Sequence, residues 1–225
     1  MSGNTETWTV LVTDLVESTD LRIRIGEPAF DRFRQRHDQL LRACIVGHLG
    51  EVVNLLGDGV TAAFGAAADA VEAAVAIQQR FGRWQHADAD ATATTVRVGL
   101  SIGDARRSGG DLHGAVVVEA ARLCAAAQPG RILCAESVHQ VLARRSDRSF
   151  VPRGLVSSKG SSPLNVCELE WEPLAAKPAG TSDGALLRLP FVGRRREQSV
   201  FTAACEQAAR GRGCVLLFEG EQGCG

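Results

Sequence analysis

The strongest constraint on the fold of this chain is the stretch LLGDGVTAAF, in which two apolar runs meet at Gly57, Asp58 and Gly59. Asp-Gly between apolar segments is a strong hairpin signal, because both central residues of a type I′ turn have positive φ. Residues 51–56 and 60–64 are therefore predicted to be the two arms of a β-hairpin. Asp58 can serve as a turn residue, as a ligand, or as both.

Hydrophobic periodicity predicts the remaining elements. The β-branched run WTVLVT, residues 8–13, indicates a buried strand that ends at Asp14, and this last residue is expected to reach a sheet edge. An amphipathic helix is expected over 27–49, with Gly50 as its stop, and an alanine-rich helix over 66–84. Further strands are predicted at 95–102, 131–134 and 165–169, and further helices at 114–127 and 137–144. The order indicates an α+β fold with one sheet and covering helices.

Charge and cysteine usage exclude several classes of protein. Lys and Arg number 25 against 26 Asp and Glu, so no basic excess points to nucleic acid or to an anionic membrane surface. The N-terminus lacks a signal-peptide pattern, and no apolar run reaches the ~18 residues of a membrane span. The seven cysteines are odd in number and never form a C-x-x-C spacing, which predicts buried thiols in a reducing cytoplasm.

The C-terminal part differs in composition from the rest. Residues 173–189 are rich in Pro, Gly and Ala without a sustained period, which is typical of a linker. Residues 190–225 then end in GEQGCG, whose outer glycines have the spacing of a P-loop. The lysine and hydroxyl residue that complete this motif are absent, so the segment is interpreted as the truncated start of a P-loop.

Asp14 and Asp58 are the strongest candidates for chemistry. Both follow or join predicted strands, and in a compact sheet such ends can be neighbours. Two carboxylates ~4 Å apart repel by ~4 kcal/mol at an effective dielectric near 20, so a cation between them is the common solution. Mg²⁺ uses one or two carboxylates together with substrate phosphates. The backbone of residues 15–19, with Ser18 and Thr19 as candidate helix caps, would offer N–H groups to those phosphates.

The motifs TVLVTDLVESTDL and LLGDGVTAAF together resemble the catalytic domain of class III adenylate and guanylate cyclases. The resemblance continues through VRVGLSIGDARRSGGDLHGAVVVEAARLCAAAQPGRIL to SKGSSPLNVCEL, about residues 7–170. It implies a ferredoxin-like sheet with surrounding helices in a domain of residues 1–172, and a homodimer whose active sites are shared head to tail. Residues 190–225 are similar to the opening of the ATPase domain that follows such domains in large bacterial regulators.

The same resemblance assigns roles to individual residues. It implies that Asp14 and Asp58 bind Mg²⁺ or Mn²⁺, that Arg122 stabilises the transition state, and that Asp111 contacts the base and Lys159 the terminal phosphates of ATP. Structural alternatives stay open for the last three. Arg122 can be a surface helix cation, Lys159 a solvated loop residue, and Asp111 the start of a turn after two glycines.

Two positions depart from the family pattern. Asn54 stands where the family has a base-recognising lysine, and Val118 stands where it has an asparagine that orients the ribose. Val118 shares a helix face with Arg122 at i,i+4, so one transition-state donor is missing.

The expected function is conversion of ATP to cyclic AMP and pyrophosphate with low activity. The alternative is a pseudo-cyclase, a dimerising module that senses nucleotide without turning it over.

Overall fold

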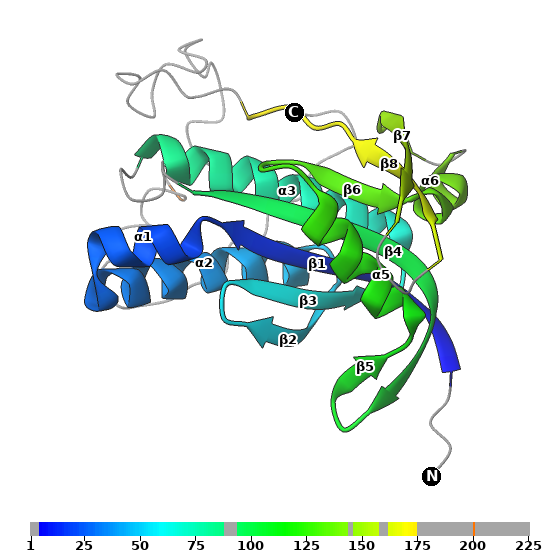
Figure 1. Cartoon of the computed structure of the whole chain (residues 1–225), viewed down its shortest axis with the longest axis horizontal. Helices are drawn as coiled ribbons and strands as arrows, with labels where there is room; N and C mark the ends of the chain where they lie inside the picture. The colour runs from blue at the N-terminus through cyan, green and yellow to red at the C-terminus, as the bar shows by residue number, and fades with distance from the viewer. Residues whose placement is uncertain (1–4, 88–93, 144–145, 158–161, 175–199, 201–225) are drawn as a thin grey trace. The chain divides into compact units, whose positions relative to one another are not determined.

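A computed structural model of the chain describes residues 5–87, 94–143, 146–157, 162–174 and 200 (Figure 1). The chain divides into two compact units, 1–176 and 177–225, and every described helix and strand except the single residue Val200 belongs to the first unit. Most of the predicted linker 173–189 and of the predicted ATPase segment 190–225 lies outside the described residues, as does Lys159.

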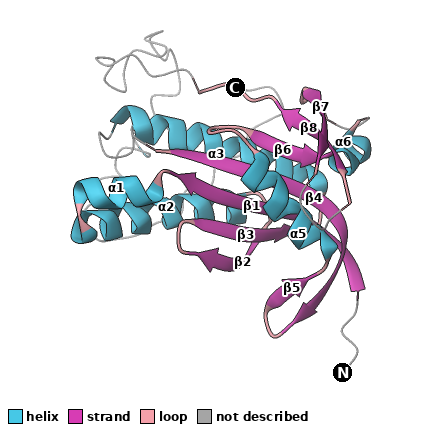
Figure 2. Cartoon of the chain, in the orientation of Figure 1, coloured by secondary structure: helices cyan, strands magenta, loops and turns pink. Residues whose placement is uncertain are grey.

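The described part of the first unit consists of one mixed sheet and five helices (Figure 2). The strands are β1 (Thr5–Val16), β2 (Glu51–Leu56), β3 (Gly59–Phe64), β4 (Thr95–Ser108), β5 (Asp111–His113), β6 (Ile132–Ala135), β7 (Phe150–Val156) and β8 (Leu164–Leu169). The helices are α1 (Ser18–Ile25), α2 (Glu27–Gly47), α3 (Ala67–Ala87), α5 (Ala115–Ala126) and α6 (Glu136–Leu142). The helices and strands predicted within residues 8–169 are present near their predicted positions, which confirms the α+β class.

The strand order places β1 in the middle of a ferredoxin-like core. The sheet runs β2-β3-β1-β4-β6-β8-β7, with β5 paired to β4. β1 is antiparallel to both β3 and β4, and the first four strands with α2 and α3 form the βαββαβ arrangement that the sequence predicts. β6 is parallel to β4, and α5 makes the crossover between them.

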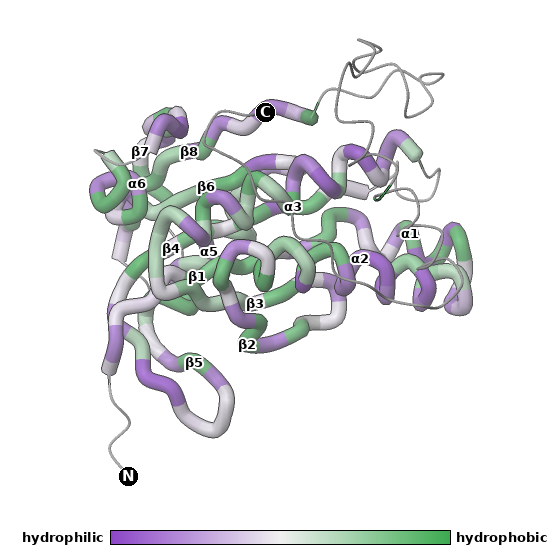
Figure 3. Tube along the Cα trace, turned by 180° about the vertical axis from the view of Figure 1, so that it is seen from behind, coloured by the Kyte–Doolittle hydropathy of each residue, from purple (hydrophilic) through white to green (hydrophobic). Residues whose placement is uncertain are grey.

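Successive residues of β1 face opposite sides of the sheet. Leu11 and Leu15 belong to the larger core, which α2, α3 and α6 cover. Val10 and Val12 belong to a second core beneath α5. In Figure 3 the central strands β1 and β3 are mainly hydrophobic, whereas α2 alternates between hydrophobic and hydrophilic stretches. The helices therefore cover both faces of the sheet, and β1 is buried between them.

The turn of the first hairpin differs from the predicted type I′ geometry. Gly57 has φ of 55°, but Asp58 is not among the residues with positive φ, which is the φ pattern of a type II′ turn. Leu56 pairs with Gly59, so Gly57 and Asp58 are the two central residues. The prediction centred the turn on Asp58 and Gly59 because it used the Asp-Gly pair alone.

Three further differences concern strands. β1 continues past Asp14 to Val16, so the prediction that this strand ends at Asp14 is wrong. β5 and β7 were not predicted. β5 is only three residues long, too short for a periodic pattern. β7 contains Pro152, which counts against a strand but is tolerated here because β7 lies at the edge of the sheet.

Two simpler predictions concern the cysteines and the membrane. Cys44, Cys124, Cys134 and Cys167 are buried and carry free thiols, as predicted, and the other three cysteines lie outside the described residues. Among the helices that the structure describes, none is long and apolar enough to cross a membrane.

Helix α5 lies directly on β4 because β4 has a glycine at the contact. A Cβ atom at Gly99 would overlap the carbonyl oxygen of Ala120 and the backbone nitrogen of Cys124. The Cys124 Sγ in turn lies 3.5 Å from the carbonyl oxygen of Arg97 and donates to it. The position of α5 on the sheet therefore depends on the absence of a side chain at residue 99.

We expect Gly99→Ala to lower the free energy of unfolding by about 2 to 3 kcal/mol, because the new methyl group must displace α5 backbone atoms. Gly82→Ala is the matched control, since Gly82 lies within α3 with open space around its Cα. That exchange should raise the free energy of unfolding by about 0.5 to 1 kcal/mol through helix propensity. Urea denaturation of both variants measures the two changes, and equal signs would contradict the packing argument.

Candidate active site

Asp14 lies in β1 on the same face of the sheet as Val10 and Val12, beneath α5. The register of β1 and β4 places it opposite Arg97. The Nε atom of Arg97 donates to Asp14 Oδ2 at 2.7 Å, and an NH2 atom lies 2.6 Å from the same oxygen. Both side chains are about one-third exposed, so this ion pair sits at the border between the core and solvent.

Asp58 is held close to Asp14 by contacts between its turn and β1. Its carbonyl oxygen accepts a hydrogen bond of 3.0 Å from the Leu15 N–H. Gly59 lies so close to β1 that a Cβ atom there would overlap the Thr13 carbonyl oxygen. The glycine after Asp58 is therefore needed for this close approach rather than for its φ angle.

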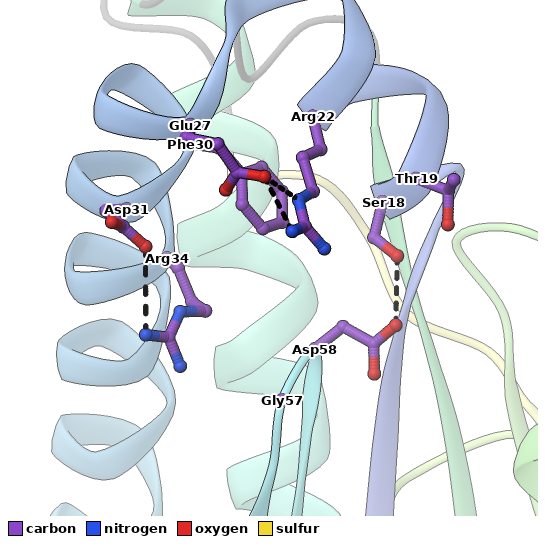
Figure 4. A pocket seen from close by; sticks show the side chains of 9 residues that line it. All are labelled: Ser18, Thr19, Arg22, Glu27, Phe30, Asp31, Arg34, Gly57 and Asp58. Atoms are coloured by element: carbon purple, nitrogen blue, oxygen red, sulfur yellow. Dashed lines mark hydrogen bonds and ion pairs between the residues drawn. The ribbon is translucent and has the colours of Figure 1, made fainter.

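The side chain of Asp58 is fixed by Ser18 at the start of α1. The Ser18 hydroxyl donates to Asp58 Oδ2 at 2.9 Å (Figure 4). Ser18 and Thr19 were predicted to cap α1, but they are its first two residues, and the capping position belongs to Glu17. Glu17 has φ of 61°, a left-handed conformation at the single residue between β1 and α1.

Both aspartates line one open cavity of about 340 Å³, together with Ser18, Thr19 and Arg97. The structure thus brings Asp14 and Asp58 together, as the sequence predicts. The predicted phosphate-binding backbone requires one correction, because the Leu15 N–H is already bonded to the Asp58 carbonyl. The first N–H groups of α1 border the cavity and lack partners within their helix.

The donor set of this cavity fits a hard divalent cation. Two carboxylates are the protein ligands that Mg²⁺ commonly uses when substrate phosphates and water complete its shell. Within the described ranges no group of three or more His, Cys, Asp or Glu side chains could hold a metal ion, so a closed zinc-type site is not formed there.

A second cavity of about 410 Å³ shares Ser18, Thr19 and Asp58 with the first and extends between α1 and α2 (Figure 4). Arg22 reaches into it and donates two hydrogen bonds, of 2.8 and 2.6 Å, to Glu27 Oε1. Asp58 therefore stands between two cavities, one containing Asp14 and one lined by the helices.

The other predicted site residues that the structure describes, Asn54, Asp111 and Arg122, do not line the cavity with the aspartates. Asn54 is exposed on β2, the edge strand, and Asp111 is exposed at the start of β5. Asp111 follows Gly109 and Gly110, whose φ angles of 62° and 93° match a type I′ turn.

Arg122 lies on α5, and one NH2 atom donates to the Ser162 carbonyl oxygen at 3.2 Å.

Two features of α5 bear on the role of Arg122. Its Nε atom is buried and has no hydrogen-bond partner among the described residues. Val118, one turn earlier on the same helix face, has 58% of its surface exposed. Arg122 thus has one buried donor without a described partner, and the exposed Val118 lies beside it on the same helix.

The sequence model of the family described as "Adenylate and Guanylate cyclase catalytic domain" matches residues 1–170. The chain belongs to this family. The protein named "Putative adenylate cyclase 3" of Rhizobium meliloti (strain 1021) is 32% identical over 165 residues. The aligned part is 73% of this chain and only 28% of that protein's length.

Solved cyclase structures share the fold of this cyclase domain. The Adenylate/Guanylate Cyclase/Hydrolase from Silicibacter pomeroyi has 27% identity and a TM-score of 0.64, covering 74% of this chain and 97% of its own. The adenylyl cyclase CyaB from P. aeruginosa has 19% identity and a TM-score of 0.67, covering 76% and 96%. The ferredoxin-like sheet with surrounding helices, expected for a class III cyclase, is therefore confirmed.

Sequence reasoning missed Arg97 in this cyclase domain. The only available signal was its position between Val96 and Val98, where a charged residue interrupts a buried strand. Cys124 lies behind the same site, and burial, with a smaller contribution from the Asp14 carboxylate, raises its pKa to about 12. Without a bound metal, the Cys124 thiol therefore stays protonated at neutral pH and is a poor nucleophile.

We expect Ser18→Ala to lower the free energy of unfolding of the cyclase domain by about 1 kcal/mol, because Asp58 loses its hydrogen bond. Thr19→Ala is the matched control. Thr19 lines the same cavity, and its hydroxyl bonds to no described residue. Its replacement should leave stability unchanged or slightly higher, since Ala favours helix. Thermal and urea denaturation test the pair, and indistinguishable losses would show that the Ser18 to Asp58 bond is not stabilising.

Proposed function

We propose that residues 1–172 form a nucleotide cyclase domain that converts ATP to 3′,5′-cyclic AMP and pyrophosphate as a homodimer with shared active sites. The observation that carries this proposal is the convergence of Asp14 and Asp58 on one open cavity at the start of α1. Family membership supports the reaction, and a relative whose name describes an adenylate cyclase supports ATP rather than GTP.

Asp14 and Asp58 would hold Mg²⁺ or Mn²⁺ in this reaction. When bound, the metal supplies Lewis-acid activation of the ribose 3′-hydroxyl and charge neutralisation at the phosphates. The protein's part is to hold both carboxylates in place, through Arg97 on one side and Ser18 on the other. The N-terminal N–H groups of α1 point their partial positive charge toward the same cavity, where phosphates would be stabilised.

The shared site follows from where the other candidates lie. Asn54, Asp111 and Arg122 are on parts of the chain that do not line the cavity with the aspartates. A second copy packed head to tail would bring its own Asn54, Asp111 and Arg122 to that cavity. The buried Arg122 Nε without a described partner fits a side chain that completes its bonding only with substrate.

We assign the following work to those residues. The ribose 3′-hydroxyl gives up its proton to solvent as its oxygen attacks the α-phosphorus. The bond from that phosphorus to the oxygen that bridges it to the β-phosphate breaks, and pyrophosphate leaves. Arg122 donates to the charge that develops on the α-phosphate, and Lys159 holds the terminal phosphates. Asn54 and Asp111 contact the base.

The free, buried cysteines fit a reducing compartment, and we place the protein in the cytoplasm.

Complementation between inactive variants tests this function. We expect Asp58→Asn and Arg122→Ala each to abolish cyclic AMP formation and an equal mixture of re-associated chains to recover about a quarter of wild-type turnover. Half of the random dimers are mixed, and each has one intact site of two. The control mixture is Asp58→Asn with Asp14→Asn. In the proposed dimer both aspartates of a site come from the same chain. Each site of this mixed dimer would therefore lack one aspartate, so no rescue is expected.

Product formation is measured with ATP and with GTP, each with Mg²⁺ and Mn²⁺. Absence of rescue in mixed dimers that demonstrably form would contradict the shared site. Wild-type turnover in either aspartate variant would contradict the metal assignment.

The low activity that we propose is attributed to Val118, where the family has an asparagine. Placing an asparagine at this position tests the idea. Val118→Asn should raise kcat by ~10-fold, because a side-chain amide one turn before Arg122 can donate to the transition state. KM should change less, since such an interaction forms mainly in the transition state. Val141→Asn is the control, because Val141 is a similarly exposed helical valine, 52% against 58%, on α6.

The control variant should keep the wild-type kcat. Turnover of a folded Val118→Asn dimer at or below wild type would favour the pseudo-cyclase, which binds ATP and releases no pyrophosphate.

A further inference from the structure

Arg97 places a positive charge on the carboxylate that is assigned to the metal. Its Nε and one NH2 nitrogen both contact the same oxygen of Asp14, Oδ2, at 2.7 and 2.6 Å. Neither contact uses Oδ1. A divalent ion that binds Asp14 must therefore either share this carboxylate with the guanidinium or displace it.

Arg97 is also anchored from the other side. Its NH1 atom donates to the Ala125 carbonyl oxygen at 3.1 Å, in the last turn of α5. That turn contains no basic residue of its own, so Arg97 supplies the cation that a helix C-terminus favours. The backbone of Arg97 is fixed as well, since its carbonyl oxygen accepts from Cys124 Sγ. These contacts to α5 hold the guanidinium beside Asp14, so we expect it to stay there when a metal ion binds.

We propose that Arg97 is an internal competitor of the divalent cation at Asp14 and thereby sets how tightly the cavity binds metal. This inference rests on the proposed function, because it assumes that Asp14 is a metal ligand. A fixed positive charge a few ångströms from a divalent ion disfavours it electrostatically, and the border position of the pair leaves this repulsion only partly screened. Arg97 is also a positioning residue, since it holds the Asp14 carboxylate in one orientation.

The two roles predict effects of opposite sign when the charge is removed. In Arg97→Gln, the affinity of the 225-residue chain for Mn²⁺ without nucleotide should rise by ~10-fold, because the competing charge is gone. The kcat of the same variant should fall, because Asp14 is no longer oriented. A purely structural role for Arg97 would lower both quantities together. Arg97→Lys keeps the charge and should keep the Mn²⁺ affinity within about twofold of wild type.

The experiment is a Mn²⁺ titration followed by the electron paramagnetic resonance signal of the free ion. Arg148→Gln is the matched control. Arg148 also binds a carboxylate, that of Glu72, through Nε and NH2, and its side chain has the same 32% exposure as that of Arg97. It lines neither cavity next to Asp58, so its variant should bind Mn²⁺ as wild type does. Arg97→Met provides a second neutral variant if Arg97→Gln folds poorly.

Asp14→Asn separates this inference from the proposed function. Loss of Mn²⁺ binding in Asp14→Asn with unchanged or weaker binding in the folded neutral variants would overturn the competitor role and leave the metal site standing. Mn²⁺ binding that does not depend on Asp14 would overturn the metal site itself, and the competitor role with it. Tighter binding in Arg97→Gln but not in Arg148→Gln supports the inference.

Discussion

The pairing of β1 with its two neighbours is the interaction on which the rest of the structure depends. β1 pairs with β4 along all twelve of its residues and with β3 on its other side. The same register that buries Leu11 under α2 and α3 puts Asp14 opposite Arg97 and brings Asp58 to the Leu15 N–H. Because a slip of one residue would turn every β1 side chain to the other face, core and site share one constraint.

Helix α5 connects the two parts of the proposed reaction within one chain. It rests on β4 at Gly99, and its last turn accepts a hydrogen bond from Arg97, which binds Asp14. The same helix carries Arg122, three residues before Ala125, and the proposed dimer uses that arginine in the other active site. A displacement of α5 would therefore affect the metal-binding side of one site and the transition-state donor of the other.

The candidate site combines rigid carboxylates with an incomplete set of donors. Each aspartate is held by its own partner, Arg97 or Ser18, and such pre-oriented groups lose little entropy when a ligand binds. On α5, Val118 offers no polar atom next to Arg122. The proposal of a slow cyclase rests on this difference. The two carboxylates proposed to bind the metal are held in place, whereas Arg122, the proposed transition-state donor, has no second polar donor at residue 118.

Local patterns in the sequence determined the helices, six of the eight described strands, the hairpin at Gly57 and the choice of Asp14 and Asp58. Periodicity and turn chemistry are properties of neighbouring residues, so these features can be predicted without the fold. Those patterns did not determine the three-residue β5, the edge strand with Pro152, or the turn type. Nor did they find the partners of the aspartates. Arg97 and Ser18 meet Asp14 and Asp58 across separations of 83 and 40 residues, and only the strand register and the docking of the hairpin on β1 decide such contacts.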